Sequence, residues 1–282
     1  MKQYSDRTAV VTGAASGIGY GIAGECVSRK MKVVLADIDP VALEKAATTL
    51  DGEVGRCITL RTDVTSESDV RALAEQAILT LGRIDFLFIN AGVNILGYTW
   101  EYDIWDWKWI IDVNLWGTIH CLTSFLPFML SQDSEAFIVF TSSGGAFLPF
   151  QTSAPYNATK SAILALAETL YNELLISGSK IRLRVVCPGM VNTNIDRAET
   201  HRQQKYQNPE VDYASMNRQK RCVPRSALEA GASVNEVAQA VFASMEREEF
   251  YVFPQANLKS VIARKFDLIL QQNMPLDLSR GP

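Results

Sequence analysis

Short apolar runs alternate with amphipathic stretches along most of the chain. The runs are short enough for strands, and the stretches between them carry apolar residues at helical spacing. Such alternation predicts a parallel sheet with helices on both faces, and continuous apolar runs such as "FLFIN" fit a sheet buried on both sides. The predicted strands, about seven in all, are residues 8–13, 31–39, 57–64, 84–92, 135–143, 181–189 and 249–254.

Local signals mark the boundaries of several helices. Pro40 suits a first helical turn, Ser66 can cap the helix that follows it, and Gly82 can end that helix. A longer helix is expected over roughly 103–130, and another begins within "SAPYNATKSAIL" at 153–164. The chain is thus predicted to fold as one doubly wound α/β domain over residues 1–282.

Two segments depart from this pattern. Residues 192–232 are polar, charged and weakly patterned, so they form either a disordered stretch or a long functional loop. Residues 255–282 follow the last predicted strand as a C-terminal extension.

Composition narrows the class of protein. Hydrophobic residues make up 48% and charged residues 21% of the 282, close to globular averages. The net charge of -4 gives no reason to expect nucleic acid or an anionic membrane as partner. No apolar run reaches the roughly 18 residues of a membrane span, and the N-terminus does not read as a signal peptide. A cytoplasmic protein is therefore expected.

Cysteine and histidine are sparse. The odd number of cysteines and their wide spacing favour reduced thiols over a disulfide framework. They are Cys26, Cys57, Cys121, Cys187 and Cys222. With His120 and His201 as the only histidines, no metal site is predicted.

A glycine turn follows the first predicted strand. "TGAASGIG" holds Gly13, Gly17 and Gly19, which would let the backbone approach a pyrophosphate at a helix N-terminus, although close helix packing alone can also require glycine. Asp37 ends the second strand 24 residues after Gly13, near the spacing expected for a carboxylate on an adenosine ribose. It would repel a 2′-phosphate, so NAD is favoured over NADP. The alternative for Asp37 is a solvated strand end.

A tyrosine and a lysine lie four residues apart on one helix face. Tyr156 and Lys160 alone would be read as an ordinary surface pair. Ser143 lies 13 residues before Tyr156. Together with the other motifs, this arrangement resembles the single-domain branch of the short-chain dehydrogenase/reductase family. The matching motifs are "TGAASGIG" at 12–19, Asp37, "DV" at 63–64, "NAG" at 90–92, Asn114, "SS" at 142–143, "YNATK" at 156–160 and "PGMVNT" at 188–193.

The resemblance implies a Rossmann-type fold and four catalytic roles. Ser143 would hydrogen-bond the substrate oxygen, and Tyr156 would be the general acid/base. Lys160 would lower the tyrosine pKa from about 10 and bind the nicotinamide ribose. Asn114 would hold a water that relays protons between Lys160 and solvent. The alternative is that Asn114 is a polar side chain that only hydrogen-bonds nearby backbone.

The resemblance also implies a NAD site. Asp63 would bind the adenine amino group, and Thr193 the nicotinamide carboxamide, although Thr193 is equally readable as a helix cap. The implied cofactor residues are Gly13, Ser16, Gly17, Ile18, Gly19, Asp37, Asp63, Val64, Asn90, Ala91, Gly92, Tyr156, Lys160, Pro188, Gly189, Val191 and Thr193.

The expected reaction is hydride transfer between nicotinamide and a secondary alcohol or ketone. Residues 192–232 fall where the family places its substrate lid. Candidate substrate residues are Ser143, Phe147, Phe150 and Tyr156, with Tyr206, Tyr213 and Met216 in the lid; the aromatic residues suit a hydrophobic or aromatic substrate but are equally readable as packing. Residues 250–275 loosely resemble bacterial members that oxidise benzylic alcohols. The alternatives are a physiological ketone reductase or a NAD-binding regulator, which would typically lack Ser143, Tyr156 or Lys160.

All five tryptophans lie in 100–116, and three of them share one side of a uniform α-helix. Trp105, Trp109 and Trp116 fall together, nearly opposite Asn114. Since the Asn114 side should face the cofactor, this tryptophan stripe is expected to be exposed and to form the interface of a homodimer or homotetramer. The alternative is that the chain's own C-terminal segment covers it.

Overall fold

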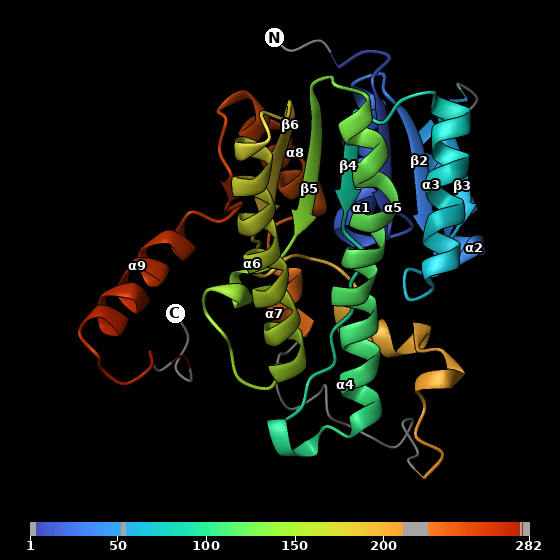
Figure 1. The fold of residues 1–282 in the computed structure, drawn as a ribbon. Helices are drawn as coiled ribbons and strands as arrows, with labels where there is room; N and C mark the ends of the chain where they lie inside the picture. The colour runs from blue at the N-terminus through green and yellow to red at the C-terminus, as the bar shows by residue number, and fades with distance from the viewer. Residues whose placement is uncertain (1–3, 52–54, 211–224, 277, 279–282) are drawn as a thin grey trace.

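A seven-stranded parallel sheet forms the centre of the molecule (Figure 1). The computed structural model describes residues 4–51, 55–210, 225–276 and 278. The sheet order is β3-β2-β1-β4-β5-β6-β7, which confirms the predicted doubly wound fold. The strands are β1 (Thr8–Thr12), β2 (Lys32–Asp37), β3 (Cys57–Arg61), β4 (Phe86–Ile89), β5 (Ala136–Thr141), β6 (Ile181–Val186) and β7 (Tyr251–Val252).

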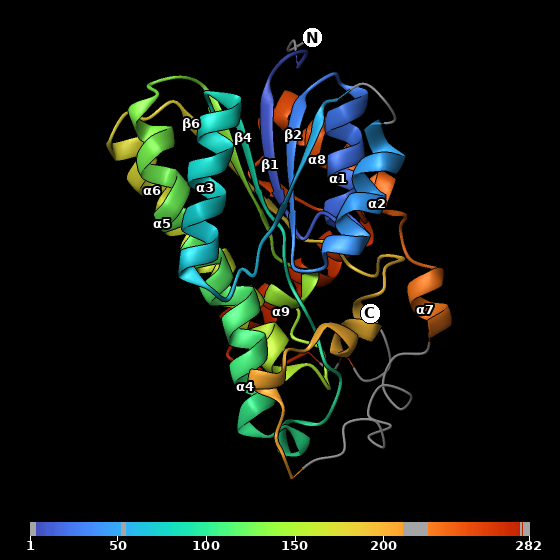
Figure 2. The ribbon, with the colours of Figure 1, turned by 90° about the vertical axis from the view of Figure 1, so that its right-hand side faces the viewer.

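Helices cover both faces of the sheet. One face carries α3 (Glu67–Leu81), α5 (Gly117–Ser131) and α6 (Ala154–Ile176). The other carries α1 (Gly17–Ser28), α2 (Pro40–Asp51) and α8 (Val234–Glu246), as Figure 2 shows in side view. Strands such as "FLFI" in β4 are buried throughout, because each face has its own apolar core.

The predicted helix signals of α3 are confirmed. The Ser66 hydroxyl accepts a hydrogen bond from the Asp69 backbone N–H at the start of the helix. Gly82 follows the last turn with φ of 74°, the left-handed conformation that glycine tolerates.

The predicted long helix is continuous but not uniform. It consists of α4 (Ile104–Ile111), a π-helical turn (Asp112–Trp116) and α5. In the described part of the chain, its 28 residues are the one helical stretch long and apolar enough to cross a membrane. Phe125 and Met129 of this helix are buried in the core, and Asn114 is fully buried, so it packs as a core helix of the domain.

The tryptophan stripe is not one exposed surface, so that prediction was wrong. Trp109 is 1% exposed and packs with Ile95, Ala198 and Tyr206, whereas Trp116 is 49% exposed. Two effects separate them. The π turn rotates the chain less per residue than an α-helix, which moves Trp116 out of line with Trp109, and residues 195–206, rather than the C-terminal segment, cover Trp109.

The described part of 192–232 is ordered into short turns. It contains η4 (Ile195–His201), η5 (Gln204–Tyr206) and α7 (Arg225–Glu229). Residues 211–224, which include Tyr213, Met216 and Cys222, lie outside the described residues. In the C-terminal extension, α9 (Asn257–Leu270) projects to one side of the body in Figure 1.

Candidate active site

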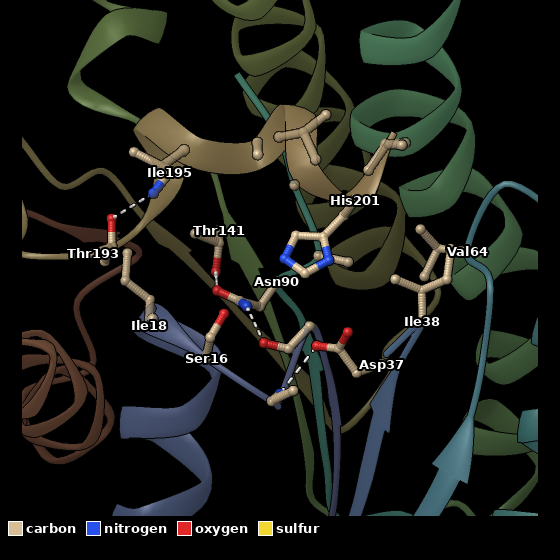
Figure 3. A pocket seen from close by; sticks show the side chains of 18 of the residues that line it. Ser16, Ile18, Asp37, Ile38, Val64, Asn90, Thr141, Thr193, Ile195 and His201 are labelled. Carbon is tan, nitrogen blue, oxygen red and sulfur yellow. Dashed lines mark hydrogen bonds between the residues drawn. The ribbon is translucent and has the colours of Figure 1, made fainter. Parts of the chain in front are cut away.

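A cavity of about 400 Å³ opens at the carboxyl ends of the strands (Figure 3). Because the strands are parallel, the segments that follow β1, β2, β4, β5 and β6 all reach this edge, where the strand order reverses between β1 and β4. The predicted cofactor residues that line the cavity are Gly13, Ser16, Gly17, Ile18, Asp37, Asp63, Val64, Asn90, Ala91, Gly92, Tyr156, Lys160, Pro188 and Thr193.

The glycine turn needs its glycines for two different reasons. Gly13 and Gly17 have φ of 64° and 55°, which side chains with a Cβ rarely adopt. Gly19 lies outside the cavity lining, but a Cβ there would overlap the carbonyl oxygen of Gly13. Gly19 therefore shapes the turn, while Gly13 and Gly17 present backbone to the cavity.

Asn90 ties this turn to two neighbouring strands. Its Nδ2 donates to the Thr12 carbonyl oxygen at 3.1 Å, and its Oδ1 accepts from the Thr141 hydroxyl at 3.1 Å. Its backbone N–H donates to the Thr12 hydroxyl at 2.9 Å. These bonds hold the ends of β1, β4 and β5 in a fixed relation below the cavity.

The Asp37 carboxylate is held at the end of β2. Oδ2 accepts a hydrogen bond from the Ala15 N–H of the glycine turn at 3.0 Å, and Oδ1 accepts from the Asp39 N–H at 3.2 Å. Figure 3 shows this carboxylate at the edge of the cavity beside Ile38. Each carboxylate oxygen thus accepts a backbone N–H, so Asp37 is not a freely solvated strand end.

Tyr156 and Ser143 lie together at the opposite end of the site. Both are buried, at 8% and 6% exposure, and the Ser143 hydroxyl hydrogen-bonds the phenol. Ser143 is not among the residues that line the cavity, and its Oγ also accepts from the Gly145 N–H at 3.0 Å. Ser142 cannot replace it, because its hydroxyl donates to the Lys160 carbonyl oxygen at 2.8 Å.

Burial dominates the ionisation of Tyr156 and Lys160. It raises the pKa of the Tyr156 phenol, and the hydrogen bond with Ser143 lowers that pKa only in part. Burial also lowers the pKa of the Lys160 ammonium to about 8. Lys160 is not among the groups that lower the pKa of Tyr156, contrary to the expectation from the sequence. Its Nζ instead donates a hydrogen bond to the Thr141 carbonyl oxygen at 2.7 Å.

Asn114 is committed to the backbone beside Gly92. Its Oδ1 accepts from the Val93 N–H at 2.8 Å, while its Nδ2 donates to the Val93 carbonyl oxygen at 3.0 Å and to the Thr159 hydroxyl at 3.1 Å. Both amide hydrogens are thus used. The Asn114 side chain therefore links the turn after β4 to the second turn of α6. This matches the alternative interpretation of Asn114, a polar side chain bonded to backbone, rather than a side chain that holds a relay water.

The segment after β6 lies across the glycine turn. The Thr193 methyl would be 3.4 Å from a Cβ on Gly17, and the Thr193 hydroxyl accepts from the Ile195 N–H at 3.4 Å. Thr193 thus lines the cavity and also supports the first turn of η4. Gly189 and Val191 lie outside the cavity lining, and Val191 is buried in the core.

A residue of the C-terminal extension holds this segment in place. The Gln255 Oε1 accepts from the Gly189 N–H at 2.9 Å, and its Nε2 donates to the Met190 carbonyl oxygen at 2.8 Å. Sequence reasoning missed Gln255, because nothing local distinguishes a glutamine that reaches back 66 residues.

The predicted aromatic substrate residues point in different directions. The Phe150 ring lies 6.2 Å from the Tyr156 ring. The Phe147 ring instead packs 5.6 Å from Phe253, with its carbonyl oxygen bonded by Lys265. Tyr206 is buried against Asp112, so it acts in packing.

Residues 195–206 supply part of the cavity that sequence reasoning did not assign. Ile195, Ala198, His201 and Gln203 all line it, together with Trp109 of α4. The family resemblance implied a substrate lid over residues 192–232. It carried no signal that this stretch also reaches the Asp37 and Asp63 end of the cavity.

Comparisons with known proteins agree with this geometry. The family model for short chain dehydrogenases matches residues 7–204. The CLA biosynthesis dehydrogenase/reductase of Lactiplantibacillus plantarum is 29% identical over 279 residues, which cover 98% of this chain and 97% of that protein. The C alpha-dehydrogenase of a Sphingobium species is 29% identical over 283 residues, covering 98% of this chain and 90% of that protein. A solved short-chain dehydrogenase/reductase of Burkholderia phymatum in complex with NAD is 33% identical, with a TM-score of 0.92 and coverage of 98% and 99%.

Proposed function

The chain belongs to the short-chain dehydrogenase/reductase family and is an oxidoreductase, and from this we propose that it is a NAD-dependent alcohol dehydrogenase. Its substrate is a secondary alcohol, hydrophobic or aromatic, that it oxidises to the ketone. The observation that carries the proposal is the buried Ser143–Tyr156 pair beside Lys160, at one end of a cavity whose other end holds the glycine turn and Asp37.

The residues present fit a nicotinamide dinucleotide. A Cβ on Gly13 would lie 2.9 Å from the Ala91 Cα, so glycine lets this turn pack closely against the end of β4, and Gly13 lines the cavity where a pyrophosphate would bind. Asp37 would hold the adenosine ribose hydroxyls, and its charge favours NAD over NADP. When bound, the oxidised nicotinamide supplies the hydride acceptor and a positive charge next to Tyr156.

Tyr156 is the proposed general base in alcohol oxidation. The Ser143 O–H would donate a hydrogen bond to the substrate oxygen, and the Tyr156 phenolate would take the hydroxyl proton. Of the three N–H donors of Lys160, one bonds Thr141, which leaves the others for the nicotinamide ribose. Because burial raises the Tyr156 pKa, oxidation should speed up as pH rises and ketone reduction should slow down.

The substrate end of the site supports an apolar substrate. Trp109 and Val113 line the cavity, and Phe150 lies outside that lining with its ring 6.2 Å from the Tyr156 ring. A screen of secondary alcohols and ketones with NAD(H) and NADP(H), followed by the absorbance of the reduced nicotinamide, tests the proposal. Turnover of aromatic or long-chain secondary alcohols with NAD supports it, and no turnover of any alcohol or ketone contradicts it.

We also propose a homo-oligomer located in the cytoplasm. Large apolar side chains remain exposed on helices α5 and α6, which cover the same face of the sheet, and on the π turn before them: Trp116, Leu130, Tyr171 and Leu175. Burial of this surface against a second copy would remove it from water. The thiols Cys26, Cys57, Cys121 and Cys187 are free, as in a reducing compartment.

A further inference from the structure

A second, smaller pocket lies at the open edge of the sheet. β7 is the last strand in the sheet order and pairs only with Val185 and Val186, so residues 181–184 of β6 have no strand beside them on that side in the described chain. A pocket of about 150 Å³, called the β6 pocket, opens there. Its lining includes Arg182 and Arg184 of β6, Glu248 of the turn before β7, and Tyr171, Leu174 and Leu175 of α6.

The β6 pocket is separate from the candidate active site. No described residue lines both cavities. Leu183 of the pocket precedes Pro188 of the larger cavity by five residues, which span about 16 Å of extended chain. The strand arrows in Figure 1 point down toward α4, so the amino end of β6 lies at the other end of the sheet.

Arg184 is buried in the wall of the β6 pocket. It is 5% exposed, and its guanidinium stacks over the Phe137 ring at 5.6 Å. Nη1 donates to the Leu183 carbonyl oxygen at 2.7 Å, and Nε is buried without a partner. Nη2 is not buried in this way and makes no hydrogen bond to the described residues. It is therefore the donor atom that the pocket leaves accessible.

A second guanidinium lines the same pocket. Side chains two residues apart in a strand point to the same side, so Arg182 lies beside Arg184. Arg182 is exposed and forms no ion pair with the described residues. Burial lowers the pKa of the Arg184 guanidinium, the charge of Glu248 raises that pKa, and the charge of Arg182 lowers it. An anion in the pocket would offset both the burial and the repulsion.

Glu248 limits which anion can enter. Its carboxylate lines the pocket without an ion pair to the described residues, whereas the neighbouring Glu249 lies 2.9 Å from Arg247. Two guanidinium groups and one carboxylate leave a single net positive charge. That balance suits a ligand with one negative charge, because Glu248 would repel a dianion such as sulfate more strongly.

The wall formed by α6 is apolar. Tyr171 and Leu175 are 41% and 57% exposed, and Leu174 and Leu183 complete this wall. An apolar group placed against these side chains would remove part of their surface from water. The pocket thus offers a cationic end and an apolar wall to one small ligand.

We propose that the β6 pocket binds a small monocarboxylate. The carboxylate accepts charge-assisted hydrogen bonds from Arg184 Nη2 and from Arg182, and the apolar body of the ligand lies against α6. This site takes no part in dinucleotide binding, so the inference stands independently of the proposed function.

Isothermal titration calorimetry of the full chain with benzoate, benzamide and sulfate tests the proposal. The wild type should bind benzoate about tenfold or more tightly than benzamide, its neutral counterpart, and than sulfate. Arg184→Met should weaken benzoate binding about tenfold. Arg71→Met removes the same charge at an exposed position of α3 outside both cavities, and it should bind benzoate as the wild type does.

Glu248→Gln gives a change that misfolding cannot imitate. The substitution removes the carboxylate that opposes the ligand, so benzoate should bind about threefold more tightly than to the wild type. Unchanged or weaker benzoate binding would show that the ligand does not lie beside Glu248, and would contradict the inference.

The other arms of the titration can also overturn it. A wild type that binds benzoate no better than benzamide does not recognise the carboxylate. Benzoate binding that is the same in Arg184→Met and Arg71→Met places the ligand elsewhere, as in the larger cavity. A wild type that prefers sulfate to benzoate holds a dianion rather than a monocarboxylate.

Discussion

Lys160 donates a hydrogen bond from its buried Nζ to the Thr141 carbonyl oxygen, 2.7 Å away at the end of β5. The side chain is 3% exposed and has no carboxylate among the charged groups that affect its pKa. A lysine in this position is retained at a cost in stability, because its charged form is removed from water without an opposite charge. Such a position is expected of a catalytic residue.

Lys160→Met should therefore change how stability depends on pH. Burial lowers the folded-state pKa to about 8, against 10.5 for the ordinary side chain. Between these values the unfolded wild type holds a proton that the folded wild type does not, so wild-type stability rises with pH. From pH 7.5 to pH 10.5, wild type should gain about 3 kcal/mol relative to the variant, measured by urea unfolding. A difference that is constant with pH would contradict the lowered pKa.

Tyr156→Phe should abolish turnover and leave dinucleotide binding largely intact. The variant removes only the hydroxyl that bonds Ser143, and the ring keeps its packing against Phe150. We expect a loss of at least a hundredfold in kcat, with a Kd for NADH within about threefold of wild type. Steady-state kinetics and fluorescence titration check the two halves. Substantial residual turnover would remove Tyr156 as the acid/base.

Asp37→Ala should weaken NAD binding and relax the bias against NADP. The carboxylate is fixed by Ala15 and Asp39 and would repel a 2′-phosphate. The ratio of kcat/KM for NAD over NADP should fall by about tenfold or more. Asp39→Ala, at a cavity residue that bonds the first turn of α2 at Ala42, serves as a neighbouring comparison. Unchanged selectivity in Asp37→Ala would show that another residue discriminates.

Gln255→Leu should impair the nicotinamide end of the site from a distance. It removes the two bonds that hold Gly189 and Met190, so the segment leading to Thr193 loses its support. We expect KM for NAD to rise about tenfold and stability to fall by about 1–2 kcal/mol, with the pH profile of kcat unchanged. Gln271→Leu, on the exposed end of α9, is the control. A wild-type KM in Gln255→Leu would show that the Gln255 contacts to Gly189 and Met190 have a purely structural role.

Sedimentation at micromolar concentration checks the proposed assembly. A dimer or tetramer is expected, and Trp116→Glu, which adds charge to a half-exposed apolar position, should shift it toward monomer. The substitution lies outside the cavity lining. A wild-type monomer would contradict the assembly.

The sequence determined the features whose physics is local. Apolar runs fixed the seven strands, Gly13 and Gly17 required a turn with positive φ, and the four-residue spacing of Tyr156 and Lys160 put both on one helix face. Parallel topology then followed, and it brought Asp37 and Asn90 to one edge of the sheet.

Only the tertiary structure decided what distant segments do to one another. Trp109 is buried because residues 195–206 pack over it, and a π turn moves Trp116 out of line with it; a uniform helical pattern contains neither feature. Asn114 bonds backbone that lies 21 residues away, and Gln203 bonds an aspartate that lies 140 residues away. Burial, which sets the Tyr156 and Lys160 pKa values, is likewise a property of the packed molecule and not of any stretch of the chain.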